Sequence, residues 1–91
     1  MASVHIKRSH QLEHDRVHQE VEQLADKLAS ELSASYSWKG ERLEFKRSGA
    51  NGFIEIGDHE VEIEIKLGML LTPLKSTIET KINDYLDKAL G

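Results

Sequence analysis

With 91 residues the chain is long enough for one domain, residues 1–91, because domains usually contain roughly 100–200 residues. Its formal charge of -4, from 12 basic and 16 acidic residues, argues against a nucleic-acid partner, since phosphate binding requires a basic face. No cysteine is present, which excludes disulfides and thiol chemistry, and no apolar run approaches the roughly 20 residues that span a bilayer. Because nothing at the N-terminus resembles a signal peptide, we expect a cytoplasmic protein without a transmembrane segment.

The first two predicted elements are a strand over residues 3–8 and a helix over about residues 13–33. In the strand, Val4 and Ile6 alternate with polar residues, which is the period of two of a half-buried strand. The helix contains no Gly or Pro, and its apolar residues recur at steps of three or four, so that they form one stripe: Val17, Val21, Leu24, Leu28 and Leu32.

Four more strands are predicted to follow in quick succession. Tyr36 and Trp38 alternate with polar residues in the next strand, and Gly40 supplies a turn. Leu43 and Phe45 carry the third strand of the chain by the same alternation. Four strands joined by such short turns must form an antiparallel meander.

The turn between the third and fourth strands is expected at Asn51-Gly52. Both residues tolerate a positive φ, and the pair is the strongest tight-turn signal in the chain. Gly49 and Ala50 leave a slightly longer loop open as an alternative.

Ile54 and Ile56 carry the fourth strand, and Gly57-Asp58 is predicted to turn the chain into a fifth strand over about residues 59–67. This last strand alternates strictly. Charged residues occupy one face, and four apolar residues point to the other, which we expect to be buried: Val61, Ile63, Ile65 and Leu67.

A second helix is expected over about residues 73–90. Thr72 suits the N-cap, and Pro73 suits the first helical position. Ser76 and Glu79 offer an alternative start, spaced as a capping box. The helix repeats apolar residues near the helical period: Leu74, Ile78, Ile82, Tyr85, Leu86 and Ala89.

These elements follow the order β-α-β-β-β-β-α and predict a two-layer α+β fold. We expect the two amphipathic helices to cover one face of the antiparallel sheet. The first strand is predicted to pair antiparallel beside the fifth, which gives the sheet order 2-3-4-5-1. The arrangement resembles a shortened helix-grip layout at the level of the fold alone.

Five histidines raise the question of a metal site. His14 and His18 are four residues apart and are candidate zinc ligands from one helix face. His10 precedes the helix, and no recognised pattern places a third ligand. We therefore expect exposed or capping histidines near a helix start, with no metal and no cofactor.

The sequence pattern assembles no catalytic group, and we expect that the protein is not an enzyme. Asp58 and His59 lie in a predicted hairpin turn, where Asp is favoured for turn geometry alone. A row of carboxylates on the outer face of the sheet, flanked by Lys46 and Lys66, is expected to form cross-strand ion pairs: Glu55, Glu60, Glu62 and Glu64.

Tyr36, Trp38 and Phe45 are expected to pack beneath the helices. Phe53 is out of phase with its apolar neighbours, which places it on the outer face or at the start of its strand. Arg47 shares the phase of the inward residues, so that it faces the core with a carboxylate partner, ends the strand or marks a polar site.

The segment from Leu67 to Leu74 is dense in apolar residues at the end of the sheet. One interpretation is that these residues close the core between strand and helix. The other is that Met69, Leu70 or Leu71 stays exposed and docks onto an apolar surface or a second subunit. Methionine suits such a surface because its side chain adapts to irregular partners.

Three stretches, VHIKRSHQL, LEFKRSGANG and EIKLGMLLTPLKSTIETKI, resemble the small bacterial family of polyhydroxyalkanoic acid system proteins. The resemblance covers nearly the whole chain and keeps its order and spacing. It implies a setting in storage-polyester metabolism, with which members of the family are associated by gene context. It supplies no catalytic residues.

The resemblance implies the setting in polyester metabolism, and together with the apolar segment it leads us to expect a non-enzymatic accessory protein. We expect that it contacts polyester granules, or proteins of polyester metabolism, through four candidate residues: Leu67, Met69, Leu70 and Leu71. An alternative is a small module that holds an apolar acyl-type ligand between helices and sheet, in a cavity that a short chain forms more readily as a dimer. Open edge strands and a small core also favour a homodimer.

Overall fold

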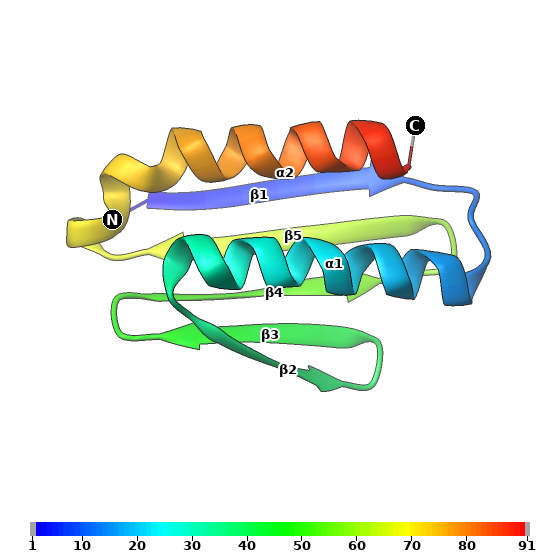
Figure 1. Cartoon of the computed structure of the whole chain (residues 1–91), viewed down its shortest axis with the longest axis horizontal. Helices are drawn as coiled ribbons and strands as arrows, with labels where there is room; N and C mark the ends of the chain where they lie inside the picture. Colours follow the sequence, from blue (N-terminus) through cyan, green and yellow to red (C-terminus); the bar gives the residue numbers. More distant parts are fainter. Residues whose placement is uncertain (1, 91) are drawn as a thin grey trace.

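The computed structural model describes residues 2–90, which form a five-stranded antiparallel sheet and two α-helices (Figure 1). The strand order β1-β5-β4-β3-β2 confirms the predicted sheet order and the α+β class. A 3-10 helix, η1, precedes the second α-helix. The elements are β1 (Ala2–Ser9), α1 (His14–Leu32), β2 (Ser35–Lys39), β3 (Arg42–Arg47), β4 (Ala50–Ile56), β5 (Glu60–Leu67), η1 (Met69–Leu74) and α2 (Lys75–Ala89).

Both α-helices lie on one face of the sheet, with α2 running along β1 (Figure 1). The strand register stacks inward residues beside one another, because Ile63 of β5 is opposite Ile6 of β1 and Ile54 of β4. These positions and the apolar stripes of the helices form one core. No helix within residues 2–90 is both long and apolar enough to cross a membrane.

Helix α1 buries the predicted apolar stripe and lies within the predicted span. It ends at Leu32, where Ser33 adopts a left-handed conformation with φ 52°. Arg47, whose place the sequence left open, reaches this end from β3, and its Nη1 donates to the Leu32 carbonyl at 2.6 Å. The side chain is exposed, so Arg47 ends its strand, and its charge complements the negative end of the helix dipole.

The turn between β3 and β4 is not at the predicted place. Asn51 and Gly52 lie inside β4, and the turn consists of Ser48 and Gly49. Gly49 has φ 85°, a left-handed conformation that glycine adopts without steric cost.

Burial of the core explains this displaced turn. The observed register sets Leu43 opposite Ile54, and both side chains are fully buried. A turn at residues 51–52 would shift the pairing and set the inward ring of Phe45 opposite Asp58. The hydrophobic register therefore outweighs the local preference of the Asn-Gly pair.

The start of the second helix also differs from the prediction. Thr72 does not cap α2; it lies in η1 beside Pro73, and its hydroxyl donates back to the Gly68 carbonyl at 3.1 Å. Helix η1 continues directly into α2, since the backbone N–H of Lys75 donates to the Thr72 carbonyl. Because a carbonyl of η1 accepts a hydrogen bond from the first N–H group of α2, no side-chain cap is needed there. Ser76, the alternative cap, is an exposed residue inside the helix.

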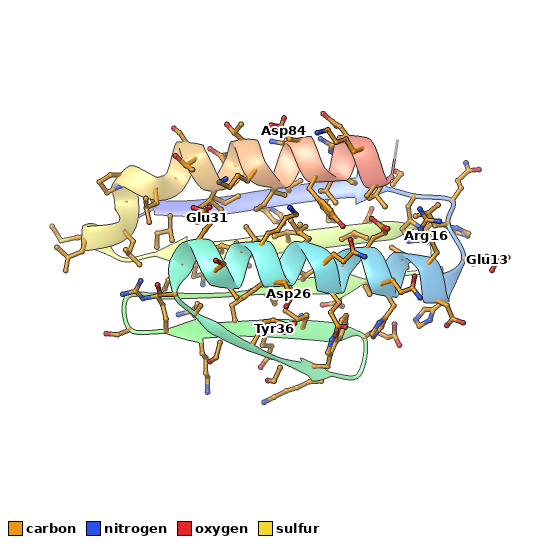
Figure 2. The ribbon with its side chains drawn as sticks, viewed as in Figure 1. Glu13, Arg16, Asp26, Glu31, Tyr36 and Asp84 are labelled. Carbon is orange, nitrogen blue, oxygen red and sulfur yellow. The ribbon has the colours of Figure 1, made fainter. Side chains whose placement is uncertain are left out.

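The inward aromatic residues pack beneath the helices, as predicted. Phe45 is buried, and Tyr36 and Trp38 are half-buried. The Tyr36 hydroxyl donates to Asp26 at 2.5 Å (Figure 2), and Trp38 Nε1 donates to Glu22 at 2.9 Å. The bond to Asp26 raises the pKa of Tyr36 to about 12. These bonds tie the edge strand β2 to α1.

Replacing Gly52 by alanine is expected to destabilise the sheet. A Cβ atom there would lie 2.3 Å from the backbone oxygen of Glu64 and 2.8 Å from the Cα of Ile65. Both are backbone atoms of β5, so the strands would have to separate locally. We expect Gly52→Ala to lower the free energy of unfolding by roughly 2–3 kcal/mol, measured by urea unfolding.

Gly40→Ala is the matched control for this measurement. Gly40 has φ 64°, and nothing lies within 4 Å of an added Cβ. Its substitution should cost only the strain of a left-handed backbone, about 1 kcal/mol. A Gly52→Ala variant as stable as the wild type would contradict the close approach of β4 and β5.

Candidate functional site

Two large apolar side chains in η1 are strongly exposed. Met69 is 80% exposed and Leu70 is 94% exposed. We call these two residues the apolar corner. In Figure 1, η1 projects beyond the ends of the strands, at the end of the sheet where β1 begins.

Backbone contacts fix the position of the apolar corner. The Gly68 N–H donates to the Gly49 carbonyl at 2.7 Å, which ties the end of β5 to the β3–β4 turn. The Leu71 N–H then donates to the Gly68 carbonyl at 3.0 Å and begins η1. A Cβ on Gly68 would lie 3.1 Å from the Gly49 oxygen, so glycine suits this close approach. The chain turns sharply here, and Met69 and Leu70 lie outside the turn.

The four residues predicted for an apolar contact lie in different environments. Leu67 is 1% exposed and belongs to the core, as the last inward residue of β5. It therefore cannot meet an external surface without leaving the core. Leu71 is half-buried and packs against the core beside the β3–β4 turn. Met69 and Leu70 are the members of the set that face solvent.

A second surface feature is a groove of about 720 Å³ between α1 and α2. Leu24 and Leu28 lie beneath it, although both side chains are almost fully buried, and charged residues from both helices line its rims. Figure 2 labels four of these charged residues: Arg16, Asp26 and Glu31 on α1, and Asp84 on α2.

Polar contacts cross this groove from one helix to the other. Lys81 Nζ lies 3.3 Å from a carboxylate oxygen of Glu31, and the Tyr85 hydroxyl donates to Glu20 at 3.1 Å. Burial, followed by the bond to Glu20, raises the pKa of Tyr85 to about 12, so the hydroxyl remains a donor at neutral pH. The sequence pattern placed Tyr85 in the apolar stripe of α2, but the spacing of that stripe did not show which residue its hydroxyl would contact. The only signal was that a half-buried tyrosine hydroxyl requires one.

His14 and His18, the candidate metal ligands, each have another partner. Nε2 of His14 is hydrogen-bonded to Glu41, and the ring of His18 stacks on Trp38 with centroids 4.0 Å apart. His10 is buried, and both ring nitrogens lie within hydrogen-bonding distance of backbone groups. Within residues 2–90, no group of three or more His, Cys, Asp or Glu side chains is placed to hold a metal ion.

Asp58 and His59 are exposed in the β4–β5 turn. The His59 carbonyl accepts a hydrogen bond from the backbone N–H of His10 at 2.8 Å. This contact holds the chain between β1 and α1 against the sheet, which is a structural role.

The outer face of the sheet carries cross-strand ion pairs, as predicted. Their cations are not Lys46 and Lys66, however. Three of the four predicted glutamates form such pairs, namely His5 with Glu62 (2.6 Å), Lys7 with Glu60 (3.7 Å) and Arg42 with Glu55 (2.5 Å), whereas Glu64 has no such partner among the described residues. Lys39 and Glu44 form a further cross-strand pair at 3.5 Å. The bond from His5 holds the pKa of Glu62 below its usual range. Phe53 lies on this face, where the guanidinium carbon of Arg42 is 4.1 Å from its ring centroid.

The fold and the apolar corner together define a two-layer α+β protein with one apolar projection beside the end of its sheet. The chain belongs to the family described as putative polyhydroxyalkanoic acid system proteins, whose model matches residues 4–90. The match extends from β1 to beyond α2 and includes the apolar corner, and it confirms the resemblance found in the sequence. No curated protein and no solved structure matches the chain.

Glu41→Gln is expected to lower the pKa of His14. The hydrogen bond to Glu41 and the charge of that carboxylate raise the pKa of His14 above its ordinary value of 6.5. The protonated ring is therefore favoured in the fold, so the contact stabilises the protein below about pH 6.5, and its contribution is lost as the pH rises through the His14 pKa. NMR titration of the imidazole resonances measures the shift.

Asp58→Asn controls for the general loss of one negative charge, because Asp58 is exposed in a turn and does not contact His14. It should leave the His14 titration nearly unchanged. The His14–Glu41 contact would be refuted by equal His14 pKa values in Glu41→Gln and the wild type.

Proposed function

We propose that this protein is a non-enzymatic accessory protein of polyhydroxyalkanoate metabolism that contacts storage-polyester granules in the cytoplasm through Met69 and Leu70. The observation that carries the proposal is the exposure of these two side chains, 80% and 94%. Membership of the polyhydroxyalkanoic acid system family supports the metabolic setting. The apolar corner supports a direct contact, because polyester granules present an apolar surface.

The size of the apolar corner favours a reversible contact. Covering one fully exposed leucine or methionine side chain contributes roughly 1.5–3 kcal/mol, so Met69 and Leu70 together supply roughly 3–6 kcal/mol. Part of this free energy is offset by the entropy lost on association. One molecule alone would therefore bind weakly, and many copies on one granule would exchange with the solution.

An apolar acyl-type ligand in the groove between α1 and α2 is the alternative function. The groove volume of about 720 Å³ favours it. Against it, a ligand would have to displace the Lys81–Glu31 ion pair and the Tyr85–Glu20 hydrogen bond, and it would lie against charged rims. Leaving such groups buried without partners is costly, so the apolar corner is the better-supported contact.

A homodimer is a competing use of the apolar corner. Two copies that covered each other's Met69 and Leu70 would remove them from any granule. The open edges of β1 and β2 offer a dimer another route, which would leave the corner exposed. Sedimentation of the protein in the absence of granules, at several concentrations, distinguishes the two arrangements from a monomer.

Co-sedimentation with isolated polyester granules tests the proposed contact. The Met69→Asp/Leu70→Asp variant should bind roughly a hundredfold more weakly than the wild type, because about 3 kcal/mol of apolar burial is lost. The control is Gln11→Asp/Gln19→Asp, which adds the same two negative charges at exposed positions and should bind like the wild type.

Circular dichroism and thermal unfolding establish that each variant is folded before binding is compared. If the double aspartate variant unfolds, Met69→Ser/Leu70→Ser removes the same apolar surface without a charge. Failure of the wild type to sediment with granules would overturn the proposal, and so would equal binding by the corner variant and its control.

A further inference from the structure

The cations around the apolar corner differ from the others in the protein, and the role inferred for them rests on the proposed granule contact. Of the 12 Lys and Arg residues, six lie within 4.0 Å of a carboxylate: Lys7, Arg8, Arg16, Lys39, Arg42 and Lys81. The other six have no such partner among the described residues: Lys27, Lys46, Arg47, Lys66, Lys75 and Lys88.

Four of these six unpaired cations lie at the end of the molecule that carries the apolar corner. Lys46 and Lys66 flank Asn51 across three neighbouring strands, one residue from the strand ends. Arg47 ends β3 beside the turn that binds Gly68, and Lys75 begins α2 directly after η1. Cations therefore approach the corner from the outer face of the sheet, from the β3–β4 turn and from the helix layer.

Few carboxylates offset these charges. The first turn of α2 contains no acidic residue, although the helix dipole favours one there. Glu31, near the end of α1, is engaged with Lys81, and Glu44, two residues from Lys46 in β3, is engaged with Lys39. Glu64 lies two residues further from the strand end than Lys66, and Glu79 lies one turn further along α2 than Lys75. The corner end is locally positive, in a chain whose net charge is -4.

We infer that the corner end binds an anionic lipid layer, with Met69 and Leu70 inserted among the acyl chains and the surrounding cations close to the head-group phosphates. The apolar corner alone would suit any apolar surface, and the cations alone would suit any polyanion. An anionic lipid layer offers both complements side by side. A nucleic acid would supply phosphates but no place for two exposed apolar side chains.

The lysines are better suited to this contact than Arg47. Nη1 of Arg47 donates to the Leu32 carbonyl, and Nε donates to the Ser48 carbonyl at 3.0 Å, so its guanidinium is held against the protein. Lys46 and Lys66 are exposed, and their long stems can extend past the strand ends towards a surface that covers the corner. Lys46 and Lys66 are therefore the residues to substitute in the test.

Vesicle flotation with the full chain measures the lipid contact. The wild type should bind vesicles of phosphatidylcholine mixed with phosphatidylglycerol, and it should not bind vesicles of phosphatidylcholine alone. Raising the ionic strength from about 0.1 M to about 1 M should weaken binding, because the screening length falls from about 10 Å to about 3 Å.

Two lysine variants with equal charge provide the decisive comparison. Lys46→Gln/Lys66→Gln should weaken binding to the anionic vesicles about 30-fold, which corresponds to roughly 1 kcal/mol for each lysine near the surface. Lys27→Gln/Lys88→Gln removes two unpaired lysines away from the corner and should bind nearly as well as the wild type.

The outcomes separate this inference from the proposed function. Equal losses in the two lysine variants, or equal binding to neutral and anionic vesicles, would overturn the lipid contact. A third outcome is that the protein does not bind vesicles and binds granules only while their own proteins are present. That outcome would identify a protein partner and overturn the lipid contact, while the proposed role at granules would survive. Binding to anionic vesicles without binding to granules would support the lipid contact and overturn the proposed function.

Discussion

The alternation of apolar and charged residues along β5 is the constraint on which the other elements depend. The strand is hydrogen-bonded on both sides, to β1 and to β4, and it keeps a strict period of two from Val61 to Leu67. The apolar face of the sheet must therefore be covered by other apolar side chains, while the charged face must stay in water. Both helices consequently lie on the same side, and the cross-strand ion pairs of His5, Lys7 and Arg42 lie on the opposite side. A chain this short has little further apolar surface to bury, so its stability depends on this core.

The apolar corner arises where that alternation stops. After Leu67 the chain must leave the sheet and enter the helix layer, and the hydrogen bond from Gly68 to Gly49 sets the direction of the turn. Leu71 packs inward, whereas Met69 and Leu70 remain outside. Folding does not require apolar residues at positions 69 and 70, because polar residues there would leave the core contacts in place. The proposed granule contact would give these two exposed apolar side chains a role that the core does not.

Elements that follow from periodicity were predictable from the sequence, and contacts between distant segments were not. The stripe of α1 and the strict alternation of β5 located those elements, and the short turns led to the correct sheet order. The prediction of a turn at Asn51-Gly52 was wrong, because the cross-strand burial of Leu43 and Ile54 outweighs a local turn preference. The apolar segment after β5 was identifiable as a whole. Its outward residues, and the cations gathered around them, depend on the Gly68–Gly49 contact and on strand register, which no local pattern encodes.

The claim that the fold holds Met69 and Leu70 in solvent is tested most directly by NMR of methyl groups with a soluble paramagnetic agent. The structure predicts strong relaxation enhancement for the methyl groups of Met69 and Leu70, intermediate enhancement for those of Leu71 and the weakest for those of Leu67, in agreement with their burial. The measurement is made on dilute protein without granules or lipid. Protection of the Met69 and Leu70 methyl groups to the level of Leu67 would contradict an exposed corner, and protection that grows with protein concentration would assign the corner to a second copy of the chain.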